Sequence, residues 1–200
     1  MHATGGKRAA GYLLVLAGGS ALLLGAASWA EGAVARSRAR ESWARGEAER
    51  AVHAARASVV GSLAPASRAR GTPVARLLIP AIGLDEIVVE GVGRRELNAG
   101  PGHLPETVLP GEPGNAALSA HRDRHFARFG DLAVGDTVVT ETPDRRIAWR
   151  VVSLRVVDRE TPAIFPSSGP MLTLTTCWPI RWFGPAPHRL IVTASPLGLR

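Results

Sequence analysis

Three residues that together can carry out acyl transfer stand at the ends of short apolar runs in this chain. Cys177, the only cysteine, ends the run Leu172-Thr173-Leu174-Thr175-Thr176, and His121 follows the run Ala116-Ala117-Leu118-Ser119-Ala120. Arg189 begins the run Leu190-Ile191-Val192, twelve positions after the cysteine. A cysteine thiolate attacks a peptide carbonyl and forms a thioester, which divides a difficult acyl transfer into two easier steps.

The other two residues match the remaining needs of that chemistry. A histidine can protonate the leaving amine. An arginine stays protonated at any working pH, so it suits donation to the developing oxyanion rather than proton transfer. Both groups also favour the thiolate form of a nearby cysteine. We therefore interpret Cys177 as nucleophile, His121 as proton-transfer partner and Arg189 as stabiliser of the oxyanion. Taken alone, a single cysteine is more often a small buried hydrophobe.

These residues lie in a β-rich region that begins near residue 73. About seven or eight short strands in under 130 residues, split by Gly and Pro, predict a compact barrel or sandwich. If the strands that end at Cys177 and begin at Arg189 are parallel neighbours, their side chains meet over the sheet. The predicted strands are 75–79, 86–89, 115–120, 137–141, 146–157, 171–177 and 189–194.

Three motifs in order resemble sortases, particularly those of class D. They are Ala120-His121-Arg122-Asp123, Thr173-Leu174-Thr175-Thr176-Cys177 and Arg189-Leu190-Ile191-Val192, and the similarity covers roughly residues 75–195. Ala120 stands where these relatives usually have glycine. The resemblance implies a closed eight-stranded sortase-type β-barrel with short helices. It also implies a transpeptidase that cleaves a Leu-Pro-x-Thr-Gly-like sorting signal after Thr and transfers the acyl group to an amine.

Partners follow from the same resemblance. The expected substrates are exported proteins with a C-terminal sorting signal, and the expected acceptor is an amine from a cell-wall precursor or a pilin-like protein. Substrate contacts are predicted for Thr176, Ala120, Trp178 and Trp182. Three of the four have a plainer interpretation, because Thr is common in strands and the two tryptophans are equally consistent with packing at the barrel edge.

Other functions remain open from the sequence. A thiol protease would release the acyl group to water, although papain-like sites use no essential arginine. A catalytically inactive, membrane-tethered binding module would not need the three residues intact. His121 and His125 have a spacing that suits a metal on a helix, but a strand precedes them. The acyl-transfer chemistry requires no cofactor and no metal, and Ca²⁺ binding is left open.

The N-terminal part predicts export and membrane attachment. Residues 9–30 hold no charge and, as a helix of about 33 Å, would span a bilayer. Because Lys7 and Arg8 precede this segment, the positive-inside rule assigns residues 1–8 to the cytoplasm and the catalytic domain to the outside of the cell membrane. The protein is therefore expected to cross the cell membrane once and to contact lipid through this segment. Small residues near 26–30 leave a cleaved signal peptide as the alternative.

Residues 31–72 are expected to form a solvated helical juxtamembrane spacer that ends in a linker at 65–73. Its Arg36, Arg38 and Arg40 are candidates for attraction to anionic lipid headgroups. The predicted catalytic domain covers residues 73–200. This domain holds fourteen basic residues against thirteen acidic ones, while residues 1–72 hold ten against four. A nucleic-acid-binding domain concentrates basic charge on its folded part, so no nucleic-acid partner is expected.

Overall fold

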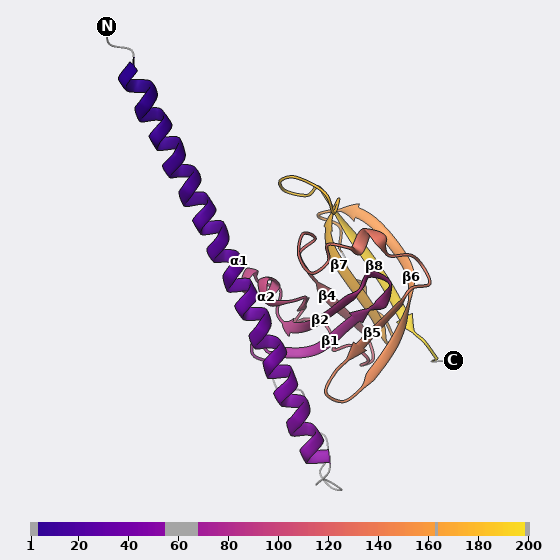
Figure 1. The fold of residues 1–200 in the computed structure, drawn as a ribbon. Coiled ribbons are helices and arrows are strands. Elements are labelled where there is room, and N and C mark those ends of the chain that lie inside the picture. The colour runs from indigo at the N-terminus through magenta and orange to yellow at the C-terminus, as the bar shows by residue number, and fades with distance from the viewer. Residues whose placement is uncertain (1–3, 55–67, 163, 199–200) are drawn as a thin grey trace.

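The computed structural model describes residues 4–54, 68–162 and 164–198 of the chain. A long helix, α1 (Thr4–Ala54), lies alongside a β-barrel whose strands are joined by turns and short helices (Figure 1). The elements that follow α1 are β1 (Pro73–Ile79), η1 (Pro80–Ile82), β2 (Leu84–Glu90), α2 (Arg94–Ala99), β3 (Gly102–His103), β4 (Asn115–Ser119), η2 (Phe129–Asp131), β5 (Thr137–Glu141), β6 (Arg146–Asp158), β7 (Met171–Trp178) and β8 (His188–Pro196).

The eight strands close into a barrel in the order β1-β2-β3-β4-β7-β8-β6-β5. This confirms the predicted closed eight-stranded β-barrel with short helices. The two-residue strand β3 and the short helix α2 were not predicted, because neither is long enough to produce a hydrophobic period. Within the barrel, β4 and β7 run parallel, with Ser119 opposite Thr175.

β7 and β8 run antiparallel, with Cys177 directly opposite Arg189. The parallel arrangement considered from the sequence is therefore wrong. Residues 179–187 form a hairpin loop between the two strands, whereas a parallel pair needs a crossover connection of about a dozen or more residues. The two side chains still meet, because residues directly opposite each other in an antiparallel pair project from the same face of the sheet.

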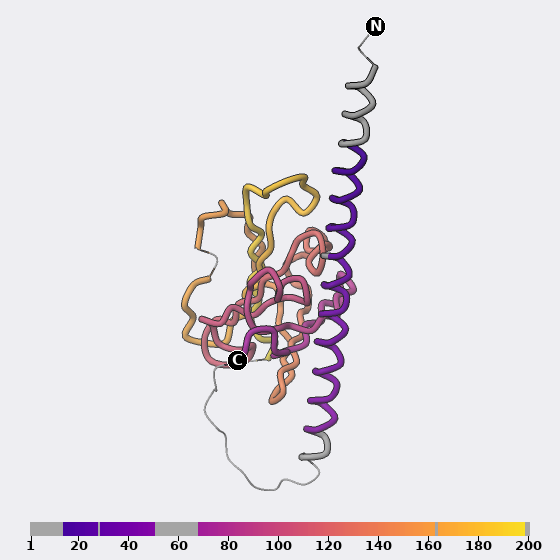
Figure 2. The backbone as a smooth tube through the Cα atoms, turned by 90° about the vertical axis from the view of Figure 1, so that its left-hand side faces the viewer, coloured from indigo at the N-terminus to yellow at the C-terminus, as the bar shows by residue number. Residues whose placement is uncertain are grey.

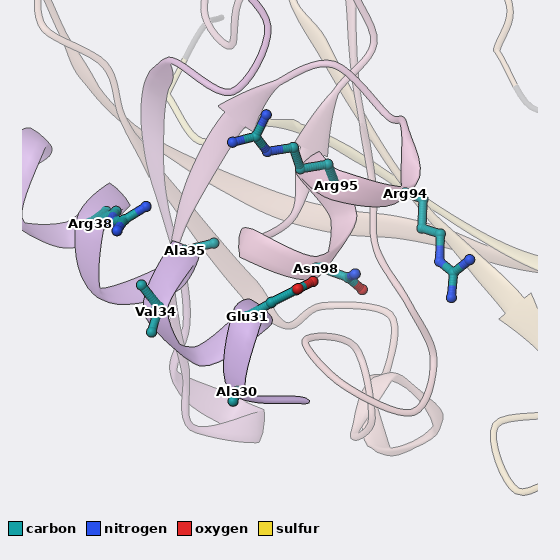
Figure 3. A pocket seen from close by; sticks show the side chains of 9 residues that line it. Ala30, Glu31, Val34, Ala35, Arg38, Arg94, Arg95 and Asn98 are labelled. Atoms are coloured by element: carbon teal, nitrogen blue, oxygen red, sulfur yellow. The ribbon is translucent and has the colours of Figure 1, made fainter. Parts of the chain in front are cut away.

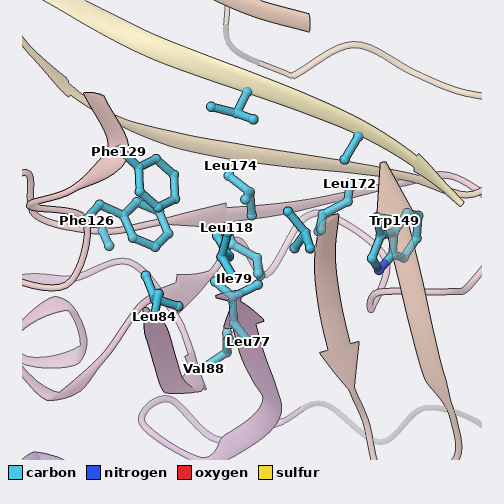
Figure 4. Packing of buried hydrophobic residues seen from close by; sticks show 14 of the residues in the cluster. Leu77, Ile79, Leu84, Val88, Leu118, Phe126, Phe129, Trp149, Leu172 and Leu174 are labelled. Carbon is cyan, nitrogen blue, oxygen red and sulfur yellow. The ribbon is translucent and has the colours of Figure 1, made fainter. Parts of the chain in front are cut away.

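The barrel interior is filled by large apolar side chains that alternate along the strands (Figure 4). On β7, Leu172 and Leu174 are fully buried. The rings of Phe126 and Phe129 stack with centroids 3.6 Å apart, which fixes the segment after β4 against the core. Trp149 is also fully buried, and its indole Nε1 donates to the Thr140 hydroxyl at 2.8 Å. This core holds the ends of β4, β7 and β8 in a fixed relation.

Helix α1 combines an apolar half with a half that packs on the barrel. It is the one helix among the described residues that is long and apolar enough to cross a membrane. Further along, Ala39 and Trp43 are buried against Ile87 and Val89 of β2, and the Arg40 guanidinium donates to the Asp85 carbonyl at 3.1 Å.

The expectation of a solvated spacer is therefore corrected over the described part of α1, where Trp43 supplies the contact with β2. The helix continues without a break from the apolar segment through Ala54. Residues 55–67, which include the rest of the predicted spacer helix and the start of the predicted linker, lie outside the described residues.

Candidate active site

Cys177 and Arg189 form a cross-strand pair near the end of the β7–β8 hairpin. Leu172 and Leu174 project into the core, so the alternation of a strand turns Cys177 to the opposite, outer face of the barrel. The thiol is free and exposed. Side chains directly opposite each other have Cβ atoms about 4.5–5.5 Å apart, so the side chains of Arg189 and Cys177 leave the sheet next to each other.

His121 comes to the same place through the parallel pairing of β4 with β7. The register that sets Ser119 opposite Thr175 continues for one more residue, because the Ala120 amide donates to the Thr175 carbonyl at 3.2 Å. The Thr176 hydroxyl in turn donates to the Ala120 carbonyl at 2.7 Å. Continuing this register sets His121 beside Cys177.

His121 and Cys177 line one cleft of about 260 Å³. The other lining residues come from three segments: Arg122 and Asp123 follow His121, residues 184–186 belong to the β7–β8 loop, and Arg159 follows the end of β6. Arg189 is not among the lining residues and lies opposite Cys177 on β8. The three predicted catalytic residues therefore come from three adjacent strands or strand ends.

The residues predicted to contact substrate are arranged in two groups. The side chains of Ala120 and Thr176 are buried, and their hydrogen bond joins β4 to β7. This burial favours a role in positioning His121 and Cys177 over direct contact. Trp178 is half-buried and packs against the barrel core, and Trp182 lies half-exposed on the β7–β8 loop. Neither tryptophan lines the cleft.

Arg122 is a residue of the site whose role the sequence did not indicate. Its guanidinium donates to the carbonyls of Trp182 and Gly184, at 3.1 and 2.7 Å. Because Arg122 directly follows His121, these hydrogen bonds hold the β7–β8 loop next to His121. The motif containing Arg122 was visible in the sequence, but its partners are backbone carbonyls about sixty positions away, which carry no side-chain signature.

His125, the second member of the possible metal pair, is buried away from the cleft, with its Nδ1 3.2 Å from Glu86 Oε1. His125 therefore does not line the cleft, although its charge is one of those that lower the pKa of His121. Within the described residues, no group of three or more His, Cys, Asp or Glu side chains is arranged to hold a metal ion.

A larger cavity lies elsewhere. It has a volume of about 830 Å³ and lies between α1 and α2, lined by residues 30–32, 34, 35 and 38 of α1 and by Arg94, Arg95 and Asn98 of α2 (Figure 3). It contains none of the predicted catalytic residues. The smaller cleft at Cys177 is the functional candidate, because only there do a free thiol and an imidazole share one space.

The electrostatic environment of His121 determines when it carries a proton. Burial lowers the pKa of its imidazole below the usual value, and the charge of Asp123 opposes this shift. Arg124 and Arg94 lower the pKa further. The imidazole is therefore predominantly neutral at neutral pH. It can accept a proton from an incoming nucleophile and then donate one to a leaving group.

Two substitutions should move the His121 pKa in opposite directions. Asp123→Asn removes the charge that raises the pKa, so the pKa should fall further. Arg124→Gln removes a charge that lowers it, so the pKa should rise. The His121 ring signals followed by NMR through a pH titration would measure both. If protonated His121 expels the leaving amine, the basic limb of kcat/KM should move to lower pH in the first variant and to higher pH in the second. A shift of both variants in the same direction would contradict this electrostatic assignment.

Comparison with known proteins identifies close similarity to one family. A model of the sortase domain matches residues 77–197. Sortase D of Bacillus subtilis (strain 168) is 34% identical over 118 residues, which cover 58% of this chain and 60% of that protein. Sortase SrtE2 of Streptomyces coelicolor is 35% identical over 127 residues, covering 52% of this chain and 49% of that protein. The match thus spans about half to three fifths of each relative's length.

A solved structure has the same fold. The structure of a Clostridium perfringens Sortase D5 transpeptidase superposes with a TM-score of 0.63 and covers 84% of this chain and 99% of its own. Its sequence identity to this chain is 21%, so it supports the fold alone. The curated relative from Bacillus subtilis agrees with the class D resemblance of the motifs.

Proposed function

Because the chain belongs to the sortase family, we propose that it is a membrane-anchored cysteine transpeptidase. It cleaves a Leu-Pro-x-Thr-Gly-like sorting signal through a thioester on Cys177 and transfers the acyl group to an amine. The observation that supports this most strongly is the arrangement of the three strand ends. Cys177 stands between His121, with which it shares a cleft, and Arg189, which is its cross-strand partner.

The proposed reaction begins when neutral His121 takes the proton of the Cys177 thiol, and the resulting thiolate attacks the carbonyl carbon of the Thr residue in the sorting signal. The carbonyl electrons move to oxygen, and the Arg189 guanidinium donates hydrogen bonds to that oxyanion. When the oxyanion collapses, the C–N bond breaks and His121 gives its proton to the departing amine. The product of this half-reaction is a thioester on Cys177 and a free amino terminus on the released peptide.

The second half-reaction reverses these roles with a different amine. Neutral His121, favoured by the lowered pKa of its imidazole, takes a proton from the incoming amine as that amine attacks the thioester. Arg189 stabilises the second oxyanion, and the C–S bond breaks to restore the Cys177 thiolate. The same three residues thus serve both half-reactions, and the steps require no metal or cofactor besides the peptide substrate and the amine.

The proposed location follows from α1. Its apolar segment would span the cell membrane once, with Lys7 and Arg8 on the cytoplasmic side and the barrel outside. The substrates are then exported proteins that bear a C-terminal sorting signal. The acceptor is an amine on a cell-wall precursor or on a pilin-like protein. The exposed cleft at Cys177 is compatible with an extended peptide entering from solvent.

The decisive experiment measures how the thioester is resolved. The full chain in detergent is incubated with a fluorescent Leu-Pro-x-Thr-Gly peptide library, with and without a peptide that has a free N-terminal glycine. The same peptide with an acetylated N-terminus is the matched control, because it lacks only the nucleophile. We expect ligated product, and a turnover that rises with the free amine alone.

Two other outcomes would replace the proposal. Release of free carboxylate at a rate indifferent to every amine would make the chain a thiol protease. Absence of any covalent adduct at Cys177 with all peptides, determined by intact-protein mass spectrometry, would make it a binding module.

A further inference from the structure

The β7–β8 loop, residues 179–187, exposes two aromatic side chains at its tip. Phe183 is fully exposed and Trp182 is half-exposed. The loop conformation is nevertheless well defined by hydrogen bonds: Arg122 donates to the Trp182 and Gly184 carbonyls, and the Trp182 indole donates to the Pro185 carbonyl at 3.0 Å. A loop that is held by hydrogen bonds and still exposes an aromatic ring to water indicates a binding surface, because exposed apolar patches usually mark one.

The position of this loop relative to α1 indicates what covers it. Figures 1 and 2 both show the loop at the end of the barrel that points towards the N-terminal, apolar half of α1. The C-terminal half of α1 is fixed to the barrel through Trp43 on β2 and through Arg40, whose guanidinium lies 3.6 Å from the Glu86 carboxylate. Because α1 is one uninterrupted helix, a membrane that contains its apolar half also meets the loop.

Basic side chains lie where the surface of that membrane would be. The cavity between α1 and α2 includes Ala30 and Glu31, the residues at which the uncharged segment ends, and its wall carries Arg38, Arg94 and Arg95 (Figure 3). Guanidinium groups bind phosphate oxygens well, and basic residues next to a membrane span are attracted to anionic lipids. Aromatic side chains favour the adjoining interface between headgroups and acyl chains. The apolar half of α1, the aromatic loop tip and the arginines thus follow the order of acyl chains, interface and headgroups in a membrane. This order fits a lipid surface better than a protein partner.

We propose that Trp182 and Phe183 insert into the lipid interface of the leaflet on the barrel side, so that the active-site cleft opens at the membrane surface. This inference rests on the membrane anchoring in the proposed function. Residues 184–186 of the same loop form one wall of the cleft that contains Cys177. Insertion of the tip therefore positions that wall against the bilayer, and a sorting signal would be cleaved close to the lipid surface.

Site-directed spin labelling of the full chain in anionic vesicles tests the insertion without any measurement of activity. Three variants are made in a Cys177→Ala background: Phe183→Cys at the loop tip, Leu23→Cys in α1 and Asp144→Cys in the β5–β6 turn. Figure 1 shows this turn at the opposite end of the barrel from the β7–β8 loop. Phe183, Leu23 and Asp144 are all exposed in the protein, so their spin labels need displace no core side chain. Each label is then assayed for collisions with oxygen, which partitions into lipid, and with a nickel chelate, which stays in water.

We expect the labels at Phe183 and Leu23 to have high oxygen and low nickel accessibility, and the label at Asp144 to have the reverse. The ratio of the two accessibilities at Phe183 should exceed that at Asp144 severalfold. A water-exposed label at Phe183 with a lipid-exposed label at Leu23 overturns the insertion and leaves the anchor intact. Low accessibility of Phe183 to both reagents means that protein covers the tip, which also overturns the insertion. A water-exposed label at Leu23 overturns the anchoring and the insertion together.

Discussion

Cys177→Ala is expected to abolish acyl-enzyme formation and turnover together. The variant lacks the proposed nucleophile, and loss of the nucleophile from a covalent-catalysis site lowers kcat on the order of 10⁶-fold. Because Cys177 is exposed and makes no core contact, the fold should be unaffected. Intact-protein mass spectrometry with the sorting-signal peptide measures the adduct, and chromatography of the peptide products measures turnover.

The control for this variant is its melting temperature in detergent, which should equal that of the wild type. Thr176→Ser is a useful companion, because it keeps the hydroxyl that donates to the Ala120 carbonyl next to the nucleophile, and it should retain most of the activity. Residual transfer by Cys177→Ala that exceeds the background reaction would show that another group forms the covalent intermediate.

Arg189→Lys is expected to reduce kcat by about 10²–10³-fold, or about 3–4 kcal/mol, if the guanidinium acts as an oxyanion donor. Lysine retains the positive charge but loses the planar fork of donors, so it cannot direct two hydrogen bonds at one oxygen. The loss should appear in kcat with little change in KM, because the oxyanion exists only in the transition state and the tetrahedral intermediate.

Arg155→Lys is the matched control for this change. Arg155 is an exposed arginine on β6, where it stands opposite Ile191 rather than Cys177. The conservative substitution there should leave kcat unchanged. Wild-type kcat in Arg189→Lys would remove Arg189 from the mechanism while leaving the role of Cys177 intact. A rise in KM alone would instead make Arg189 a substrate-binding residue.

The sequence predicted the strands of this site well because they have a strong local signal. β7 alternates Leu and Thr up to the cysteine, and Pro179 marks its end. The direction of β8 relative to β7 was predicted wrongly, as parallel instead of antiparallel. The loop of residues 179–187 was visible in the sequence and is too short for a crossover, so the antiparallel pairing was within reach of the same reasoning.

Other features had no local signal to reveal them. Helix α1 meets β2 through Trp43, one large residue in a segment of Ala, Arg and Glu, and a single apolar position produces no helical period. Thr176 is the exception, because it shares the face of Leu172 and Leu174 and strand alternation alone indicates its burial. The bonds from Arg122 to the β7–β8 loop depend on backbone carbonyls, which every residue has.

The cross-strand pairing of Cys177 with Arg189 makes the spacing of these two residues independent of the length of the connecting loop. The β-ladder sets the separation of the two side chains, and the ladder extends along the hairpin as far as the pairing of Leu172 with Ala194. Residues can therefore be inserted into or deleted from 179–187 without changing the distance between the proposed nucleophile and the proposed oxyanion donor. Descendants of such a hairpin can acquire new peptide preferences by loop exchange while the reaction itself is inherited unchanged, and a designer could graft loops here for the same reason.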